Sequence, residues 1–122
     1  MEYEKWIDDF MSAWKTRDVE VVMETIAQDC EYYETVFDRP CETFDDIKKL
    51  WKVVPTNQSD IEYSYKILAQ DNESCIVNFF VTRKLLPSGV IQDVDGIFQI
   101  SVDENNKCTF FKQWRSSKEI IN

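Results

Sequence analysis

Histidine is absent from this 122-residue sequence, and glycine occurs only twice, at Gly89 and Gly96. Without histidine the chain cannot build a Ser-His-Asp triad, a histidine acid–base site, an HExxH metal site or a zinc site with histidine ligands. Two isolated glycines cannot form a phosphate-cradling loop or a dinucleotide-binding fingerprint. Several large classes of enzyme are therefore excluded.

Positive charge is also scarce. The chain has 14 Lys and Arg against 23 Asp and Glu, a net charge of -9 at pH 7. No electrostatic attraction to nucleic acid or anionic lipid is expected from this balance. No apolar run approaches the ~20 residues that cross a bilayer, and Met1–Trp6 lacks a cationic stretch followed by an apolar one. We therefore expect a cytoplasmic protein that binds neither nucleic acid nor membrane.

Cysteine occurs four times without a CxxC pair, at Cys30, Cys41, Cys75 and Cys108. Intracellular thiols normally stay reduced, so buried free thiols are expected rather than a disulfide or metal framework. We expect no metal site and no organic cofactor.

Apolar residues make up 43% of the chain and aromatic residues 14%, which is typical of one folded domain spanning residues 1–122. Helical spacing of apolar residues predicts three helices. Their apolar stripes run over Tyr3–Trp14, over Val19–Ala27 after the N-cap Asp18, and over Phe44–Trp51 before Pro55. Thr43 and Asp46 form a capping box at the start of the third. A short strand is predicted over Glu31–Phe37, where aromatic and β-branched residues gather.

The second half of the chain changes to a two-residue period, which is typical of strands. Four strands are predicted, over Ile61–Ile67, Cys75–Leu86, Val90–Val102 and Lys107–Arg115. Short turns between them indicate an antiparallel meander. The predicted fold class is α+β, with three N-terminal helices packed on a four-stranded antiparallel sheet and one extra short strand.

Both faces of this predicted sheet carry apolar side chains, and helices can cover only one of them. The other face would expose an apolar patch of Ile76, Phe80, Ile97, Phe110 and Trp114. A patch of this kind exceeds what monomers usually expose. We therefore expect a homodimer formed through the sheet.

This order of elements resembles the nuclear transport factor 2-like superfamily, and most closely its SnoaL-like and ketosteroid isomerase-like branches. The segments that carry the resemblance are Arg17–Glu20, Ile26–Tyr32, Phe44–Ile47 with Trp51, and Phe111–Arg115. The resemblance covers nearly the whole chain. It implies a cone-shaped fold, in which a curved sheet and the helices enclose a pocket, and dimers formed through the sheet.

The same resemblance places the catalytic carboxylate of the isomerases on Glu34. A carboxylate at the mouth of an apolar cavity can take and return a proton, although Glu34 would otherwise be a solvated acid at the end of a strand. The isomerase hydrogen-bond donors fall on Phe10 and Phe98, which cannot donate. The Asp-Arg-Asp set of family epoxide hydrolases would need Arg83 with Asp93 or Asp95, which lie on opposite faces of their strands.

These observations leave three functions open. The leading interpretation is a SnoaL-like protein that binds a small, largely apolar molecule in an aromatic-lined pocket. The alternatives are a cofactor-independent isomerase or cyclase with Glu34 as general base, and a non-catalytic dimerisation or protein-binding module. A cavity of about 300 Å³ or more would favour the first two, and a filled cone the third. The expected ligand contacts are Phe10, Trp14, Tyr33, Phe37, Trp51, Phe79, Phe98, Phe111, Gln113 and Arg115.

Overall fold

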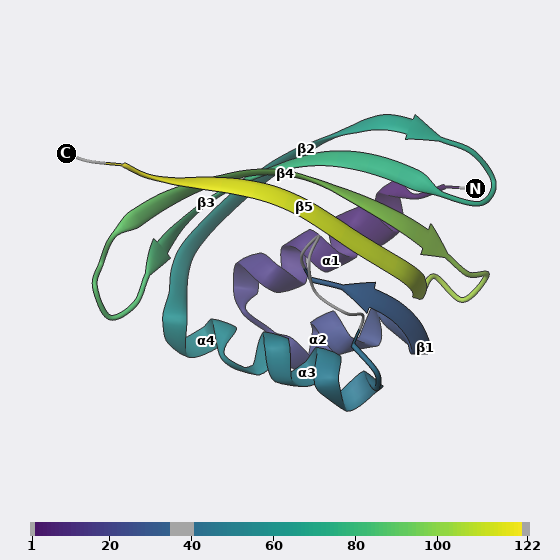
Figure 1. The fold of residues 1–122 in the computed structure, drawn as a ribbon, viewed down its shortest axis with the longest axis horizontal. Helices are drawn as coiled ribbons and strands as arrows, with labels where there is room; N and C mark the ends of the chain where they lie inside the picture. The colour runs from purple at the N-terminus through teal and green to yellow at the C-terminus, as the bar shows by residue number, and fades with distance from the viewer. Residues whose placement is uncertain (1, 35–40, 121–122) are drawn as a thin grey trace.

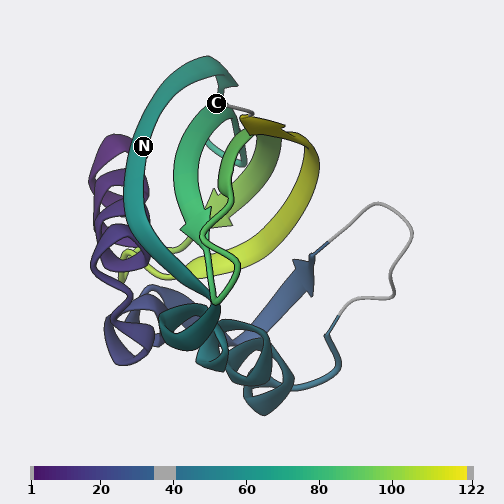
Figure 2. The same ribbon diagram turned by 90° about the vertical axis from the view of Figure 1, so that its left-hand side faces the viewer.

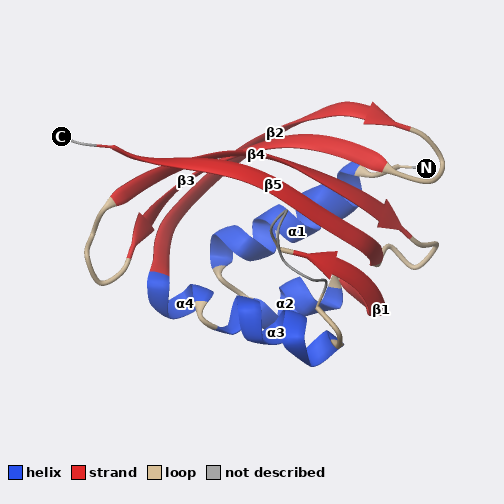
Figure 3. Cartoon of the chain, in the orientation of Figure 1, coloured by secondary structure: helices blue, strands red, loops and turns tan. Residues whose placement is uncertain are grey.

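The structure is a computed structural model, which describes residues 2–34 and 41–120. Helices come first along the chain, interrupted by one strand, and four long strands follow (Figures 1 and 3). The helices are α1 (Glu4–Thr16), α2 (Val19–Glu24), α3 (Phe44–Lys52) and the single turn α4 (Val54–Asn57). The strands are β1 (Ile26–Tyr33), β2 (Gln58–Gln70), β3 (Cys75–Leu85), β4 (Ile91–Val102) and β5 (Cys108–Ile120).

One five-stranded sheet contains all of the strands, in the order β1-β5-β4-β3-β2. The long strands pair antiparallel as predicted, whereas β1 runs parallel to β5 at the edge. The sheet curls strongly, and the helices lie against its concave side (Figures 1 and 2). The predicted α+β cone is confirmed, with the extra strand joined to the sheet. No helix in the described parts of the chain is both long and apolar enough to cross a membrane.

The start of α3 follows the sequence prediction. The Thr43 side chain accepts a hydrogen bond from the backbone N–H of Asp46, and the Asp46 side chain accepts one from the backbone N–H of Thr43. This reciprocal capping box satisfies two N–H groups that the helix itself cannot pair. It fixes the position of the helix that carries Trp51.

Helix α2 and strand β1 differ from the prediction at their shared boundary. The apolar spacing extended the helix to Ala27, but α2 ends at Glu24 and β1 begins at Ile26. The backbone oxygen of Thr25 accepts hydrogen bonds from the indole of Trp6 and from the backbone N–H of Cys108. These distant contacts turn the chain into the sheet, where local periodicity had favoured another helical turn. Of the strand predicted over Glu31–Phe37, the part from Thr35 to Phe37 lies outside the described residues.

The interior is built from aromatic rings. Trp6 stacks on Phe10 at 4.8 Å between centroids, and Tyr32 stacks on Phe111 at 4.6 Å. Phe79 and Phe98 join the same cluster with centroids 5.3 Å apart. Gly96 allows this packing, since a Cβ atom there would lie 2.6 Å from the Phe79 ring and 2.7 Å from the backbone oxygen of Trp114. The apolar end of the cone is therefore filled.

The inward-facing side chains change character toward the other end of the sheet. On β3, the buried residues Val77, Phe79 and Val81 are followed on the same face by Arg83. On β5, the buried Phe111 is followed by Gln113 and then by Arg115. The inward-facing side chains of β3 and β5 thus change from apolar to polar at the end of the sheet where β2 begins and β3 ends. The polar end is where a cavity opens beside α3 and α4.

Candidate functional site

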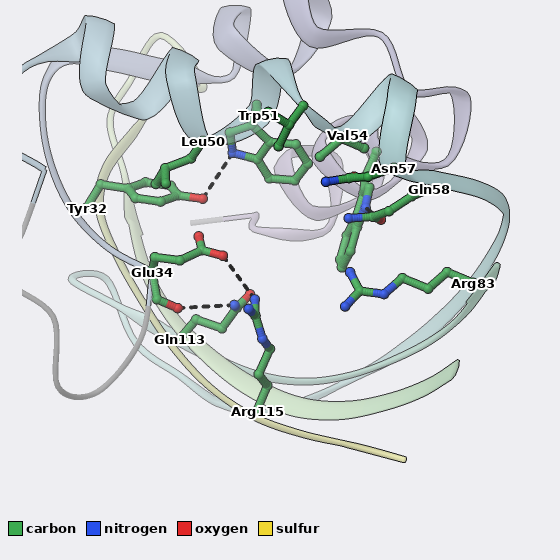
Figure 4. Close-up of a pocket in the computed structure, with 12 residues that line it drawn as sticks. Tyr32, Glu34, Leu50, Trp51, Val54, Asn57, Gln58, Arg83, Gln113 and Arg115 are labelled. Carbon is green, nitrogen blue, oxygen red and sulfur yellow. Dashed lines mark hydrogen bonds and ion pairs between the residues drawn. The ribbon is translucent and has the colours of Figure 1, made fainter. Parts of the chain in front are cut away.

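A cavity of about 240 Å³ lies at the polar end of the cone (Figure 4). This volume is below the 300 Å³ expected for a ligand pocket, because the phenylalanine rings occupy the deeper interior. The cone is nevertheless not filled. The lining residues are Trp14, Tyr32, Glu34, Leu50, Trp51, Val53, Val54, Asn57, Gln58, Arg83, Gln113 and Arg115.

Glu34 lies one residue beyond β1 and is anchored by β5. Nη1 of Arg115 donates a hydrogen bond to Oε1 of Glu34 at 3.0 Å, and Nε2 of Gln113 donates one to its backbone oxygen at 3.3 Å. The side chains of Glu34 and Arg115 are 29% and 35% exposed, so the ion pair lies at the cavity mouth. The resemblance implied a carboxylate at the mouth of an apolar cavity, whereas the mouth at Glu34 also holds the guanidinium of Arg115. Oε2 of Glu34 keeps its acceptor sites open among the described residues.

Tyr32 places a hydroxyl group beside Glu34. Its oxygen accepts a hydrogen bond from Nε1 of Trp51 at 3.1 Å (Figure 4). Burial raises the pKa of Tyr32 well above its usual range, and the charge of Glu34 raises it further. The hydroxyl therefore keeps its proton. No acceptor for that proton occurs among the described residues, so Tyr32 can donate it to a molecule in the cavity.

Arg83 enters the cavity from the opposite wall (Figure 4). Its Nε atom donates a hydrogen bond of 2.8 Å to Oε1 of Gln92, the residue directly across from it on β4. Burial lowers the pKa of the guanidinium, and the charge of Arg115 lowers it further, while Glu34 opposes both effects. An arginine still remains charged at neutral pH.

The apolar wall comes from two tryptophans, Trp14 on α1 and Trp51 on α3. Their rings meet edge to face with centroids 5.7 Å apart. Nε1 of Trp14 donates a hydrogen bond to Oε1 of Gln58 at 3.0 Å, which fixes this indole. The site thus combines an apolar wall of two perpendicular indoles with a carboxylate, a hydroxyl and two guanidinium groups.

Two solved structures are similar to the chain over nearly its whole length. One is the epoxide hydrolase/cyclase-like enzyme SalBIII, described as having a role in pyran ring formation in the polyether salinomycin, with a TM-score of 0.81, 12% identity, and coverage of 97% of this chain and 95% of that one. The other is an LEH-like epoxide hydrolase of M. tuberculosis, with a TM-score of 0.72, 14% identity, and coverage of 93% and 82%. The chain has the nuclear transport factor 2-like fold. No protein-family model and no curated protein matches the sequence.

Within this nuclear transport factor 2-like fold, the predicted site residues fall into two groups. Glu34, Trp14, Trp51, Gln113 and Arg115 line the cavity. The remaining described candidates lie elsewhere, namely Phe10, Phe79, Phe98, Phe111 and Tyr33. The four phenylalanines belong to the buried ring cluster, and Tyr33 packs beside Phe110 and Lys112. Contact of these five side chains with a ligand stays a prediction, while Phe37 lies outside the described residues.

The resemblance to family enzymes can now be compared in space. Phe10 and Phe98 lie together, with ring centroids 6.1 Å apart, and neither side chain can donate a hydrogen bond. Asp93 and Asp95 accept hydrogen bonds from Thr82 and Asn78 on the outer face of the sheet. Arg83 points inward, away from both acids. The site therefore has a different set of charged residues, in which the carboxylate of Glu34 is paired with Arg115 and the guanidinium of Arg83 lies across the cavity (Figure 4).

Tyr32 and Arg83 were not among the predicted contacts of this cavity, although strand parity could have indicated both. Residues two apart on a strand share a face, so an inward Glu34 implies an inward Tyr32 rather than Tyr33. Arg83 likewise continues the buried row of Val77, Phe79 and Val81. No comparable signal marks Asn57 and Gln58, which reach the cavity because α4 turns the chain into β2.

Proposed function

We propose that the chain is a cofactor-independent enzyme that rearranges a small organic molecule, an isomerase or cyclase in which Glu34 is the general base. The observation that carries this proposal is the placement of Glu34, whose carboxylate faces the cavity and is held by Arg115 at 3.0 Å. General bases must reach the proton that they remove, and this position meets that condition for a molecule in the cavity. The similarity to two enzymes of epoxide chemistry supports a reaction of this kind.

The proposed reaction is a proton transfer with no net change in composition. Glu34 takes a proton from a hydroxyl or an acidic C–H group of the substrate. In a hydroxy-epoxide, the electron pair left on the hydroxyl oxygen forms a C–O bond to an epoxide carbon while the epoxide C–O bond breaks and its electron pair moves to the epoxide oxygen. In an enolisable ketone, the electron pair of the C–H bond forms a C=C bond while the carbonyl π bond opens onto oxygen. The oxygen that gains negative charge accepts a hydrogen bond from the Tyr32 hydroxyl. Glu34 then returns the proton to the product. Preorganised donors at a developing oxyanion supply a large part of many rate enhancements.

Binding without turnover is the second candidate function. It is favoured by the rings of Phe10 and Phe98, which lie where the resemblance places the isomerase donors. In the enzyme that we propose, the hydroxyl of Tyr32 supplies a donor from a different position. The two candidates therefore differ in whether the wild-type protein converts a substrate and whether that conversion depends on Glu34.

The test uses two series of substrates, hydroxy-epoxides that can close to cyclic ethers and enolisable unsaturated ketones, each followed by proton NMR. We expect the wild-type protein to convert members of one series, and Glu34→Gln to lower that rate by about 10²- to 10⁴-fold, the usual contribution of a general base. Glu31→Gln, on the exposed face of β1, is the matched control and should retain the rate. Equal turnover by Glu34→Gln, or no turnover of either series by the wild type, contradicts the proposal.

A further inference from the structure

Charge at the cavity has the opposite sign to that of the whole protein. The chain carries a net charge of -9. Among residues 2–34 and 41–120, the charged residues lining the cavity are the cations Arg83 and Arg115 and the anion Glu34, which together give a net charge of +1. The other lining residues are neutral, since Tyr32 keeps its proton. A locally positive site on an acidic protein selects for a negatively charged ligand.

The two arginines have different partners. Arg115 is paired with Glu34 at 3.0 Å, and this ion pair neutralises both groups. Arg83 has no ion pair with any described residue, and its one hydrogen bond goes from Nε to the neutral side chain of Gln92. Its two terminal Nη atoms remain open. A partly buried charge without a counterion costs free energy, and a ligand of opposite charge recovers that cost.

Acidic side chains near Arg83 are engaged elsewhere. The adjacent Lys84 lies 4.0 Å from Asp60, and Thr82 donates a hydrogen bond to Asp93. Because neighbouring residues on a strand point to opposite faces, these acids belong to the outer side of the sheet. Within the described parts of the chain, the anion of the cavity is Glu34, which is paired with Arg115 and forms no ion pair with Arg83.

We propose that the substrate of this site carries a carboxylate, which Arg83 binds through its two Nη atoms while the apolar body of the molecule lies against Trp14 and Trp51. A guanidinium group matches the planar geometry of a carboxylate with two parallel hydrogen bonds. The apolar body is required by the tryptophan wall, which inorganic anions would leave uncovered. A cavity of roughly 150 Å³ already holds benzene, so about 240 Å³ accommodates one substituted ring.

The carboxylate proposal rests on the proposed function, because it names the class of substrate for the same site. It also gives the charged groups of the cavity different roles. Arg83 fixes the carboxylate at one wall, and Glu34 reaches the reacting part of the molecule from the opposite wall (Figure 4). Arg83 therefore acts as a residue that determines substrate specificity. The carboxylate does not react, so its binding can be measured without turnover.

The test compares benzoate with benzamide, a neutral molecule of nearly the same shape, by isothermal titration calorimetry. We expect the wild-type protein to bind benzoate about tenfold or more tightly than benzamide, as expected for a charge-assisted hydrogen-bond pair. Arg83→Gln should remove this preference, and Arg83→Lys should retain part of it. Lys84→Gln removes the same charge from the next residue on the opposite face, so it should retain the full preference. The melting temperature of Arg83→Gln should equal or exceed that of the wild type, which shows that the variant is folded.

Other outcomes would overturn the inference. These are equal affinity of the wild type for benzoate and benzamide, an unchanged preference in Arg83→Gln, affinity for inorganic phosphate equal to that for benzoate, and no benzoate binding at millimolar concentration. Glu34→Gln separates this inference from the proposed function. Without the negative charge of Glu34, the variant should bind benzoate as tightly as the wild type or more tightly, while its turnover falls. Benzoate binding with turnover unaffected by Glu34→Gln would contradict the proposed function alone. Turnover of hydroxy-epoxides or unsaturated ketones that lack a carboxylate, without turnover of their carboxylate-bearing analogues, would contradict the proposed carboxylate and leave the proposed function standing.

Discussion

Gly96 shows how much of this fold depends on the absence of one methyl group. Because Gly96 has no side chain, the Phe79 ring lies directly on β4, in the space that a Cβ atom would need. Gly96→Ala should lower the free energy of unfolding by about 1–3 kcal/mol, as is usual for overpacking. The Phe79 ring can shift, but the backbone oxygen of Trp114 is held in the β4–β5 ladder. Urea denaturation measures the change.

A second substitution tests the cause. Phe79→Leu in the Gly96→Ala background removes the ring that the new methyl group meets, so the double variant should lose less stability than the sum of the two single variants. Strict additivity would show that the contact with Phe79 is not the source of the loss.

Individual residues also show how much of the cavity lining could be predicted from the sequence. Glu34, Gln113 and Arg115 were proposed together, and all three line the cavity. Their position depends on strand parity and on the edge pairing of β1 with β5, which places Glu34 beside the end of the Gln113 row. The phenylalanines were harder to assign, because a buried ring has the same sequence pattern whether it faces a cavity or another ring.

At the scale of elements, the capping box of α3 should contribute measurably to stability. Thr43→Ala removes the oxygen that accepts from the N–H of Asp46, and it should lower the free energy of unfolding by about 1 kcal/mol. Thr43→Ser keeps that oxygen and should retain most of the stability. Chemical denaturation of the three proteins measures both effects. An equal loss in Thr43→Ser would assign the cost to the methyl group of Thr43 rather than to the cap.

Helix α3 and strand β1 differ in how far their sequences specify them. The Thr43–Asp46 box and the apolar stripe of α3 both point to a helix, and the structure confirms it. Around Thr25 the local sequence pattern and the distant contacts favour different structures. Ile26 and Ala27 continue the helical spacing of apolar residues, but both belong to β1, and Ile26 pairs with β5. The partner of Thr25, Cys108, is far away in the sequence. Helical periodicity carries no information about such a contact, so the boundary was misplaced.

At the scale of the whole molecule, the outer face of the sheet predicts self-association. Phe80 and Trp114 are 41% and 39% exposed there, and Ile97 and Phe110 are half-buried on the same face. We propose that a second copy covers this face and that Phe80→Glu separates the two copies. Val21→Glu, an equally exposed position on α2, is the control and should leave the assembly intact. Light scattering at tens of micromolar distinguishes the states, and a monomeric wild-type protein would exclude the dimer.

The pairing of two indoles at the cavity has a practical consequence. Trp14 and Trp51 lie in contact at the wall, and each donates its ring N–H to a neighbouring polar side chain. Tryptophan emission depends on how much water surrounds the ring. A molecule seated on these two rings therefore changes the fluorescence of the protein, so that its occupancy can be read optically without a label or a chromogenic substrate.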